Sequence, residues 1–420
     1  MIFKFFKFLN TQNKEYCIIN GYKDIVEEVD TESDIDILFK QKDFLQINKI
    51  INHFCKEQNI IMVQVLHHDL WAKNIFLFNP KDGKYLNLDL YGELSRKEII
   101  FFKEKEIFSS LSIYKSIPIL SPEKEFVNYL IKKLDKNDLS ISNFMHLHSL
   151  YQNNKSKCKD SLNSFFPTLY ATVSDIFEAK DFELMQRTRD QIISDFYSLK
   201  NIDYKKMFLN INRTIERIFK PTGLTISFLG PDGSGKSTVI DGLLENRFPF
   251  RRKDYFHLKP IVSKVSSTNN EMITDPHKYN PYSKLKSYTK LLYFIYQYSS
   301  GWIKNISKLK IKSSLIIFDR YFDDMIVDNK RYRYGGSKVI AKLACFFIPK
   351  PEVYFILTAD AQIIYERKQE VPFEELERQI VEYRALTDGK RYFNIEVNRT
   401  PEEIVKEITL IMMDKMNERY

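Results

Sequence analysis

The sequence predicts an α/β domain with a parallel sheet over residues 221–420, a smaller α+β domain over residues 1–110, and a helical connector over residues 111–220. In the last part, short apolar runs alternate with helical segments, which is typical of a parallel sheet. Five of the chain's 12 glycines also lie within residues 223–242. The first part instead has several strand-like runs around a single internal helix.

Residues 1–110 contain five runs with the length and apolar content of strands. These runs are Tyr16–Asn20, Ile35–Phe39, Ile61–Leu66, Ile75–Phe78 and Tyr85–Leu90. We expect a helix over residues 43–56, between the second and third runs, and a buried helix at the N-terminus. This arrangement predicts a mixed sheet.

The segment that follows is expected to be helical. Ser121 and Pro122 have the residue types of an N-cap and a first helical position, and acidic residues follow in the first turn, where the helix dipole favours negative charge. From Asp175 to Phe219 the apolar residues recur at helical spacing. We therefore expect helices to join the two sheet-containing parts.

The last 200 residues contain four runs that fit buried strands. They are Leu224–Leu229, Ser314–Phe318, Val353–Leu357 and the weaker Tyr392–Val397. The final helix has a clear start, because Thr400 and Glu403 have the spacing of a capping box around Pro401. These features favour a parallel sheet with crossover helices.

Composition narrows the class of protein. Hydrophobic residues make up 44% of the 420 residues and charged residues 28%, which fits a globular protein and excludes a disordered chain. The net charge of +9 suits an anionic small molecule, a nucleic acid or a solvated basic surface. Since no RNP, zinc-finger or helix-turn-helix signature is present, a nucleic-acid partner is not expected.

The cysteines and the length of the apolar runs indicate the cellular compartment. None of the four cysteines lies in a C-x-x-C pair, so neither a zinc site nor a disulfide framework is expected, and reduced thiols favour a cytoplasmic protein. No apolar run reaches the ~18 residues of a membrane span. The N-terminal apolar segment is interrupted by Lys4 and Lys7 and lacks a signal-peptide cleavage site.

A phosphate-binding loop is the most specific motif. Residues 230–238 read Gly-Pro-Asp-Gly-Ser-Gly-Lys-Ser-Thr and match G-x-x-x-x-G-K-[ST] between a predicted strand and a predicted helix. Glycines allow backbone N–H groups to surround a polyphosphate, Lys236 places a charge on it, and Ser237 can ligate Mg²⁺. The expected nucleotide-binding residues are Gly230, Asp232, Gly233, Ser234, Gly235, Lys236, Ser237 and Thr238. The loop predicts ATP-type binding, which kinases share with GTPases and motor ATPases.

A second motif favours a kinase. Asp319 and Arg320 follow the predicted strand 314–318. An acid at the carboxyl end of a parallel strand beside the phosphate loop can hold Mg²⁺. Arg320 can bind a second phosphate with two parallel hydrogen bonds, and this phosphate would belong to an acceptor.

These motifs resemble the thymidylate kinase-like family of P-loop nucleoside monophosphate kinases. The resemblance covers about 200 residues from position 222 and rests on the loop, on Asp319-Arg320-Tyr321 and on the strand-like run after Pro351. It implies that Arg320 contacts the acceptor's phosphate. It also implies a lid at Glu366-Arg367-Lys368, with Arg367 meeting the transferring phosphoryl group.

The chain departs from this family at the acceptor site. An Arg-Glu-Pro-Gly-Gly stretch is missing, and Tyr255–Pro260 and Asp275–His277 stand in its place, followed later by Tyr332–Gly336. These variants resemble a branch of the family associated with bacterial surface-polysaccharide gene clusters. The acceptor is therefore expected to be a phosphorylated small molecule of undefined identity.

Three carboxylates mark the N-terminal part. Asp34 and Asp36 lie two residues apart on a predicted strand, so both side chains point to one face, and Asp89 lies on a later strand. Such a group can bind Mg²⁺. It resembles the nucleotidyltransferase fold, although Gly21-Tyr22 replaces the usual Gly-Ser. A domain that only binds a nucleotide or a partner is the alternative.

The sequence thus predicts a two-domain enzyme. Its C-terminal domain is an ATP- and Mg²⁺-dependent kinase, and its N-terminal domain is nucleotidyltransferase-like. The alternative is a regulatory P-loop NTPase with a non-catalytic N-terminal binding module. Arg320 distinguishes the two hypotheses, because a regulatory switch needs no clamp for an acceptor.

Overall fold

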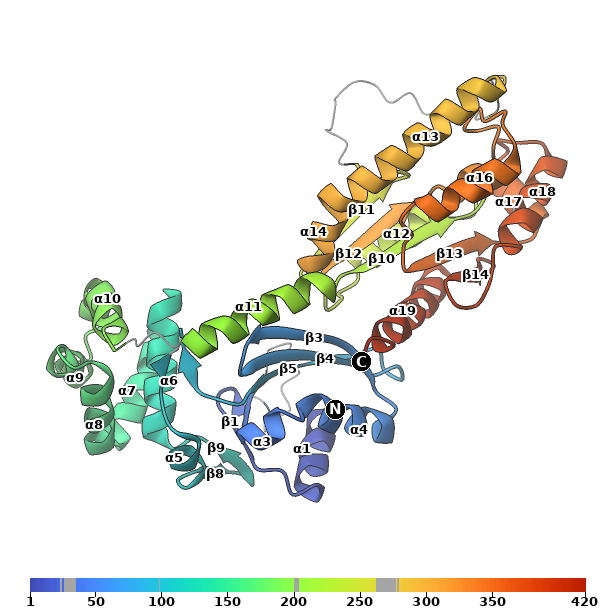
Figure 1. Cartoon of the computed structure of the whole chain (residues 1–420). Coiled ribbons are helices and arrows are strands. Elements are labelled where there is room, and N and C mark those ends of the chain that lie inside the picture. The colour runs from blue at the N-terminus through green and yellow to red at the C-terminus, as the bar shows by residue number, and fades with distance from the viewer. Residues whose placement is uncertain (23–24, 26–34, 98, 200–203, 262–276, 278) are drawn as a thin grey trace. The chain divides into compact units, whose positions relative to one another are not determined.

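The computed structural model describes residues 1–420 except 23–24, 26–34, 98, 200–203, 262–276 and 278 (Figure 1). The chain divides into two compact units. Unit 1 contains Met1–Ile215 together with Tyr420, and unit 2 contains Glu216–Arg419, so that the division falls within helix α11 (Tyr204–Phe219). Over the described residues, every helix is too short or too polar to cross a bilayer.

Unit 1 is built on a mixed seven-stranded sheet. In sheet order the strands are β3 (Ile61–Asp69), β4 (Ala72–Phe78), β5 (Tyr85–Tyr91), β2 (Ile35–Phe39), β1 (Tyr16–Ile18), β9 (Ile117–Ile119) and β8 (Ser112–Tyr114). The β2–β5 and β1–β9 pairs are parallel, and the other neighbouring strands are antiparallel. Strands β6 (Ser95–Arg96) and β7 (Ile99–Ile100) form a separate ribbon. The mixed sheet agrees with the sequence prediction.

One face of this sheet is covered by α1 (Ile2–Thr11), α3 (Gln41–Phe44) and α4 (Ile47–Gln58). Ile35 and Ile37 alternate toward this face of the sheet and join a core with Phe5 and Phe54. The N-terminal helix is therefore partly buried through its apolar residues, as expected. Transfer of these side chains from water is the main driving force for this packing.

The helices that follow the sheet are α5 (Glu104–Phe108), α6 (Pro122–Lys136), α7 (Ile141–Asn153), α8 (Lys155–Phe165), α9 (Tyr170–Ala179) and α10 (Phe182–Tyr197). Their core includes Cys17 and Leu38 from the sheet as well as Phe126 from α6. The predicted boundary at residue 110 therefore differs from the structure. Strands β8 and β9 lie beyond it in the same sheet, so the helical segment and the sheet share one core.

Unit 2 is built on a five-stranded sheet in which every neighbouring pair is parallel. In sheet order the strands are β11 (Arg252–His257), β12 (Ser314–Asp319), β10 (Leu224–Leu229), β13 (Val353–Thr358) and β14 (Tyr392–Glu396). The four predicted strands are confirmed. Strand β11 was not predicted, because only Phe256 of its six residues is buried and the strand lacks an apolar run.

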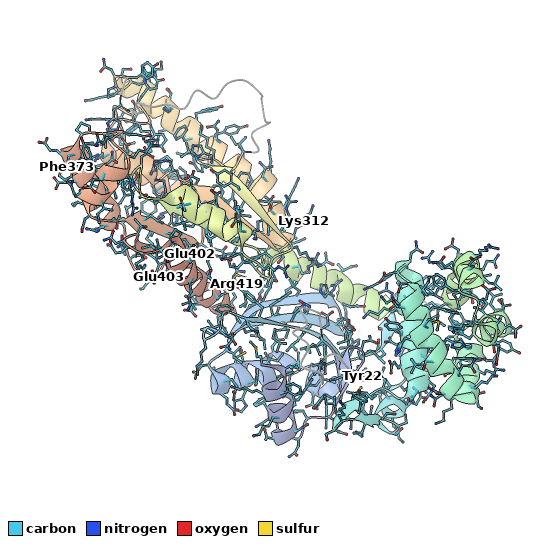
Figure 2. The ribbon with its side chains drawn as sticks, turned by 180° about the vertical axis from the view of Figure 1, so that it is seen from behind. Tyr22, Lys312, Phe373, Glu402, Glu403 and Arg419 are labelled. Atoms are coloured by element: carbon cyan, nitrogen blue, oxygen red, sulfur yellow. The ribbon has the colours of Figure 1, made fainter. Side chains whose placement is uncertain are left out.

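The helical elements of unit 2 are α12 (Lys236–Glu245), α13 (Lys284–Gly301), the π-helical turn η1 (Trp302–Ile306), α14 (Ser307–Ile311), α15 (Asp324–Val327), α16 (Lys338–Ala344), the 3₁₀ turn η2 (Cys345–Phe347), α17 (Ala361–Arg367), α18 (Phe373–Arg384) and α19 (Pro401–Asn417). Helix α13 packs Phe294 and Tyr298 into a core with Phe318 of β12. The start of α19 has the predicted capping box, with Thr400 and Glu403 each accepting the other's backbone N–H. Figure 2 labels Glu403.

The backbone after β11 is held against α13 and η1. The Tyr298 hydroxyl donates to the Leu258 carbonyl at 2.7 Å, and the Asn305 amide donates to the Pro260 carbonyl at 2.9 Å. Gly301 lies against the same segment, so a Cβ on this residue would lie 2.5 Å from the Pro260 oxygen. These contacts fix residues 258–260, and Leu258 is held at φ +60°.

Replacing Gly301 with alanine should destabilise unit 2. The added methyl group would collide with the Pro260 backbone, and overpacking of this kind costs about 1–3 kcal/mol of unfolding free energy. Urea denaturation of Gly301→Ala beside Ser300→Ala, its neighbour on the same helix, would measure the effect. Equal stability of the two variants would contradict the close approach described here.

Candidate active site

The phosphate loop has a backbone that requires its glycines. Gly230, Gly233 and Gly235 have φ of +139°, +82° and +82°, a region that residues with a side chain rarely adopt. A Cβ at Gly230 would also lie 2.4 Å from the Leu357 carbonyl oxygen of β13. Gly235 is the N-cap of α12, so the loop leads directly into the positive end of a helix dipole.

A cavity of about 910 Å³ opens over this loop. All loop residues from Asp232 to Thr238 line it, as do Asp319, Arg320 and Arg367. Gly230 shapes the loop without being among the lining residues. The cavity has the size of a ligand site and concentrates positive side chains, which suits a polyphosphate.

Lys236 is buried and turned onto the loop itself. Its ammonium donates to the carbonyl oxygens of Gly230 and Pro231, both at 2.8 Å. Burial, followed by the nearby charge of Arg320, lowers the pKa of Lys236 to about 7. A bound phosphate would favour the charged form of this lysine and raise its pKa again.

Asp319 ends β12 at the edge of the same cavity. Burial alone would raise its pKa, but the hydrogen bond from His257 and the charges of Lys236 and Arg320 hold the pKa of the carboxyl below its usual range. One oxygen, Oδ2, accepts from the Tyr255 hydroxyl at 3.1 Å. The other, Oδ1, is buried and has no hydrogen-bond partner among the described residues.

The residues expected to hold magnesium are suitable for that role. A buried carboxylate oxygen without a partner is costly unless a ligand satisfies it, and Asp319 Oδ1 is such an atom. Ser237 lines the same cavity from the first turn of α12, and its side chain is exposed. A carboxylate and a hydroxyl are oxygen ligands of the kind that Mg²⁺ prefers.

Arg320 is buried in a strained backbone conformation. Its φ is +67°, its N–H donates to the Phe228 carbonyl at 2.9 Å, and only 5% of the residue is exposed. The guanidinium donates to Asp324 at 2.7 Å and also to Asp232. Strain at a non-glycine residue is typical of functional sites.

Asp324 is the buried carboxylate that pairs with the Arg320 guanidinium. It is fully buried, and both the Tyr332 hydroxyl (2.7 Å) and the Tyr383 hydroxyl donate to its carboxylate. These bonds compensate the burial of the negative charge, which would otherwise be costly. Asp324 was not predicted, because its contacts are with residues 8 and 59 positions away in the sequence.

Asp232 has a different environment from the one expected. We predicted it as a nucleotide-binding residue, and it does line the cavity, but its two oxygens accept from Arg320 and Arg331. Arg331 also contacts Asp328 at 3.3 Å and Glu370 at 3.7 Å. Arg331 was missed, although it directly precedes the unusual Tyr332–Gly336 segment.

The predicted lid arginine lies beside the cavity. Arg367 is the last residue of α17, lines the cavity and donates to the Val397 carbonyl at 3.4 Å. Lys368 and Arg399 also line the cavity and were not predicted. The cavity therefore carries more positive side chains on this side than the sequence analysis identified.

The N-terminal carboxylates come together only in part. Asp36 and Asp89 are register partners on the parallel strands β2 and β5, which places them on one face of the sheet. The Asn74 amide donates to Asp89 at 2.5 Å, and the Tyr91 hydroxyl donates to Asp36 at 3.1 Å. Asp34 lies outside the described residues.

A lysine that we did not predict contacts this group. The Lys132 ammonium, on α6, lies 2.9 Å from Asp36 Oδ2. The side chain of Asp36 is 10% exposed and that of Lys132 is 28% exposed. The protein thus supplies its own cation to the carboxylate that we expected to bind a metal, which argues against a magnesium site at Asp36.

Tyr22, in the place of the usual nucleotidyltransferase serine, also faces α6. It is buried, and its hydroxyl donates to Glu125 at 3.3 Å (Figure 2). The His146 ring nitrogen lies 2.9 Å from the other oxygen of Glu125. The position is therefore engaged by protein groups on α6 and α7.

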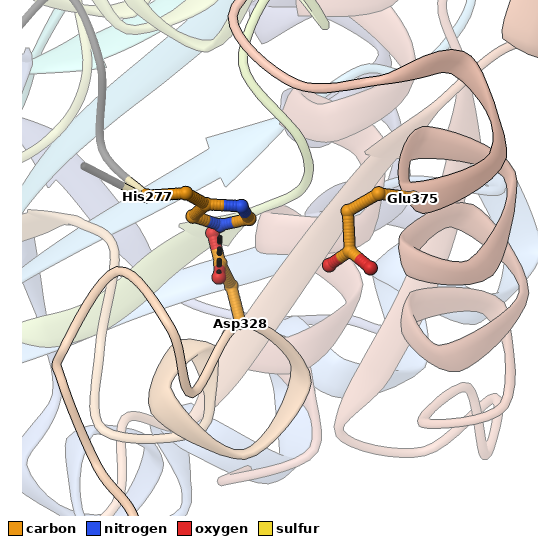
Figure 3. Close-up of side chains that lie close together, drawn as sticks. All are labelled: His277, Asp328 and Glu375. Atoms are coloured by element: carbon orange, nitrogen blue, oxygen red, sulfur yellow. Dashed lines mark hydrogen bonds and ion pairs between the residues drawn. The ribbon is translucent and has the colours of Figure 1, made fainter. Parts of the chain in front are cut away.

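His277, Asp328 and Glu375 form a further group of metal-ligand types in unit 2, with ligand atoms within 4.8 Å of one another (Figure 3). His277 contacts Asp328 at 2.8 Å. Arg331 pairs with Asp328, and Arg378 pairs with Glu375 at 2.6 Å, so both carboxylates already have cationic partners. We interpret the group as an anchor for His277. Asp275, which we placed with His277 at the acceptor site, lies outside the described residues.

Comparisons with known proteins find similarity in the C-terminal part of the chain. The family model described as thymidylate kinase matches residues 228–408. A thymidylate kinase from Lactobacillus helveticus is 24% identical over 215 residues, covering 47% of this chain and 99% of that protein. A probable thymidylate kinase from Methanosarcina barkeri is 26% identical over 205 residues, covering 44% of this chain and 94% of its own. The solved thymidylate kinase from Candida albicans is 17% identical, with 46% of this chain and 93% of that one covered and a TM-score of 0.34.

Residues 228–408 thus form a thymidylate kinase-like P-loop kinase domain. The matched segment includes the phosphate loop, Asp319 and Arg320, which line one cavity. The predicted α/β fold with a parallel sheet and the predicted kinase are both confirmed. The nucleotidyltransferase resemblance of residues 1–110 stays a prediction.

Nucleotide binding should take up a proton above neutral pH. The pKa of Lys236 is about 7 in the free protein, so at pH 8 the lysine is mostly neutral, and a bound phosphate restores its charge. We expect an uptake approaching about one proton per nucleotide at pH 8, and much less at pH 6, where the lysine is already charged. Calorimetry of ADP binding in buffers of different ionisation enthalpy would measure it.

The variant Lys236→Arg supplies the control, because a guanidinium stays charged throughout this pH range. Wherever this variant still binds ADP, its proton uptake at pH 8 should be near zero. Equal uptake by the variant and the natural protein would show that another group titrates.

The Asp36–Lys132 pair should be measurable by a double-mutant cycle. Lys132→Met leaves the Asp36 carboxylate without its ion pair and should lower the free energy of unfolding by about 1–3 kcal/mol. In an Asp36→Asn background the same change should cost much less. Urea denaturation provides the values, with Lys133→Met as the control for a lysine that pairs with the exposed Asp138.

Magnesium tests the competing interpretation of this group. If the carboxylates form a metal site, 10 mM MgCl₂ should stabilise the natural protein through unit 1, and Asp36→Asn should remove that effect. The ion-pair interpretation would be overturned if the double-mutant cycle gave a coupling free energy of zero between residues 36 and 132 and MgCl₂ stabilised the natural protein.

Proposed function

We propose that the C-terminal domain transfers the γ-phosphoryl group of ATP to the phosphate of a small phosphorylated acceptor. The observation that supports this most strongly is the position of Arg320. Its buried guanidinium lines the cavity that contains the phosphate loop, and it is held by Asp324 and Asp232. A regulatory NTPase needs no such second anion site.

In this proposal an oxygen of the acceptor's phosphate attacks the γ-phosphorus, the bond to the β–γ bridging oxygen breaks, and ADP leaves. The loop and Lys236 hold the triphosphate, while Arg320 and Arg331 orient the acceptor's phosphate. Arg367 and Lys368 stabilise the charge on the transferred group. Magnesium, held by Ser237 and Asp319, would neutralise charge on the phosphates.

The acceptor is proposed to be a nucleotide-like or sugar phosphate of bacterial surface-polysaccharide metabolism. The variant segments Tyr255–Pro260 and Tyr332–Gly336 support this proposal, because they replace the family's usual acceptor-site residues. The four cysteines are free thiols, which suits a reducing cytoplasm.

We propose that the N-terminal domain is a binding module, rather than a second active nucleotidyltransferase. The support comes from the Lys132–Asp36 ion pair and from the buried Tyr22, since both engage groups that a transferase would leave for metal and triphosphate. The contrary hypothesis, a second transfer activity at Asp34, Asp36 and Asp89, predicts Mg²⁺-dependent release of pyrophosphate from ATP.

The kinase proposal can be tested by measuring ADP release from ATP over a panel of nucleoside and sugar monophosphates with the full-length protein. With an acceptor found in this way, Arg320→Lys should raise the acceptor's KM at least tenfold. The lysine keeps the charge but loses the bidentate contact. The Kd for ATP should change less than twofold.

Arg384→Lys is the matched control, because Arg384 pairs with Glu396 at 3.0 Å and is not among the residues that line the cavity. A large loss of ATP affinity in Arg320→Lys with an unchanged acceptor KM would assign Arg320 to the nucleotide. The proposal would then lose its main support.

A further inference from the structure

Positive side chains gather around the aromatic rings of Phe294 and Tyr282. Lys286 is exposed and lies 4.2 Å from the centre of the Tyr282 ring, and three less exposed cations accompany it. The Lys259 ammonium lies 4.4 Å from the centre of the Phe294 ring, and the Lys290 ammonium lies 5.5 Å from the same ring. Lys290 is also 5.3 Å from the ring of Tyr282, and the Arg333 guanidinium is 4.2 Å from that ring. We call Lys259, Lys290 and Arg333 the cation cluster.

The cluster has no acidic partner in the part of the chain that the structure describes. Among the described residues its hydrogen bonds go to backbone carbonyls, since Lys290 donates to Tyr332 and Arg333 donates to Asn280 at 3.2 Å. Elsewhere in this domain the buried arginine Arg320 is paired with carboxylates. Like charges brought together without counter-charges are unfavourable, and such a cost is typical of a site that awaits an anion.

The electrostatics agree with this geometry. Burial lowers the pKa of Lys259, and burial together with the charges of Lys259 and Arg333 lowers the pKa of Lys290. Both shifts show that the charged forms are disfavoured in the free protein. An anion among the three groups would reverse the effect.

The cluster is also held in place. Lys259 lies between Leu258 and Pro260, whose carbonyl oxygens accept hydrogen bonds from Tyr298 and Asn305. Leu258 and Arg333 both have positive φ, +60° and +52° respectively. Strained residues on a fixed backbone are characteristic of preorganised ligand sites.

The chain connects the cluster to the active-site cavity at two points. His257 and Arg331 line the cavity, and Lys259 and Arg333 each follow one of them by two residues. Two residues span at most about 7 Å between Cα atoms, so the backbones of Lys259 and Arg333 lie within that distance of residues that line the cavity. Arg331, one of these lining residues, shares Asp232 with Arg320.

We propose that the cation cluster binds a second anionic group of the acceptor, a carboxylate or a phosphate. This inference rests on the proposed kinase function and specifies its substrate class. The acceptor then carries two anionic groups, one that receives the phosphoryl group at Arg320 and one at Lys259, Lys290 and Arg333. An acidic sugar phosphate and a nucleoside bisphosphate both have this chemistry.

Thermal unfolding of the full-length protein tests the cluster directly. With the phosphate loop saturated by Mg·ADP, inorganic phosphate is titrated at constant ionic strength into the natural protein and into Lys259→Gln/Lys290→Gln. The rise in melting temperature should be at least twofold larger for the natural protein. The control is Lys308→Gln/Lys312→Gln, whose lysines are exposed on the same domain and should leave the rise unchanged.

The melting temperature without phosphate serves as each protein's own baseline. The double variant loses the Lys290 hydrogen bond and the ring contacts of both lysines, so only the rise from that baseline reports on anion binding. An equal phosphate response in the natural protein and the double variant would overturn the proposal.

Matched ligands distinguish the two anions. Glucuronic acid 1-phosphate against glucose 1-phosphate tests a carboxylate, and thymidine 3′,5′-bisphosphate against thymidine 5′-monophosphate tests a phosphate. In the same thermal titration, at least one doubly anionic ligand should bind tenfold more tightly than its partner, and the double variant should lose that difference. Differences under twofold in both pairs would refute the second anion site. Since these are binding measurements, they stay separate from the ADP-release test of the kinase proposal.

Discussion

The ion pair between Arg320 and Asp324 is the interaction around which the active site is organised. Through its backbone N–H, Arg320 joins the end of β12 to β10, and through its guanidinium it joins the phosphate loop to Asp324. Tyr332 and Tyr383 hold that carboxylate from a loop and from α18. Burying these charges is costly, and the cost is offset because each group has several hydrogen-bond partners. Three segments that are far apart in the sequence, at residues 228–232, 320–332 and 383, are thus fixed relative to one guanidinium.

The sequence was sufficient wherever local chemistry decides the structure. The glycines of the phosphate loop are required by their own backbone angles, so a spacing pattern predicts them. Four strands of the parallel sheet have apolar runs because both faces are buried. By contrast, β11 has one buried residue and lacks this signal. Asp324 and Arg331 gain their roles from tertiary contacts, and a spacing pattern does not contain that information.

The N-terminal domain shows the same division. The alternation of residues along strands correctly predicted that Asp36 and Asp89 share a face of the sheet, and their register confirms it. The ion pair with Lys132 joins residues 96 positions apart, and the basic residues of α6 alone gave no reason to expect it. This contact gives the Asp36 carboxylate an ammonium partner from the protein itself. Carboxylates on neighbouring strands therefore do not by themselves specify the cation that neutralises them.

The arginine pair Arg320 and Arg331 and the cation cluster differ in whether a carboxylate neutralises their charge. Arg320 and Arg331 share Asp232, so a phosphate that binds them has to compete with this carboxylate. The competition lowers the affinity for any single phosphate and keeps the two guanidiniums in place in the free protein. The cation cluster has no such carboxylate among the described residues, so an anion bound there gains the full interaction. An acceptor with only one anionic group would have to compete with Asp232 and would have no second anion to bind at the cation cluster. Under the proposed kinase function, selection for a doubly anionic acceptor would follow from this distribution of acids, because Arg320 and Arg331 are compensated by carboxylates and the cation cluster is not.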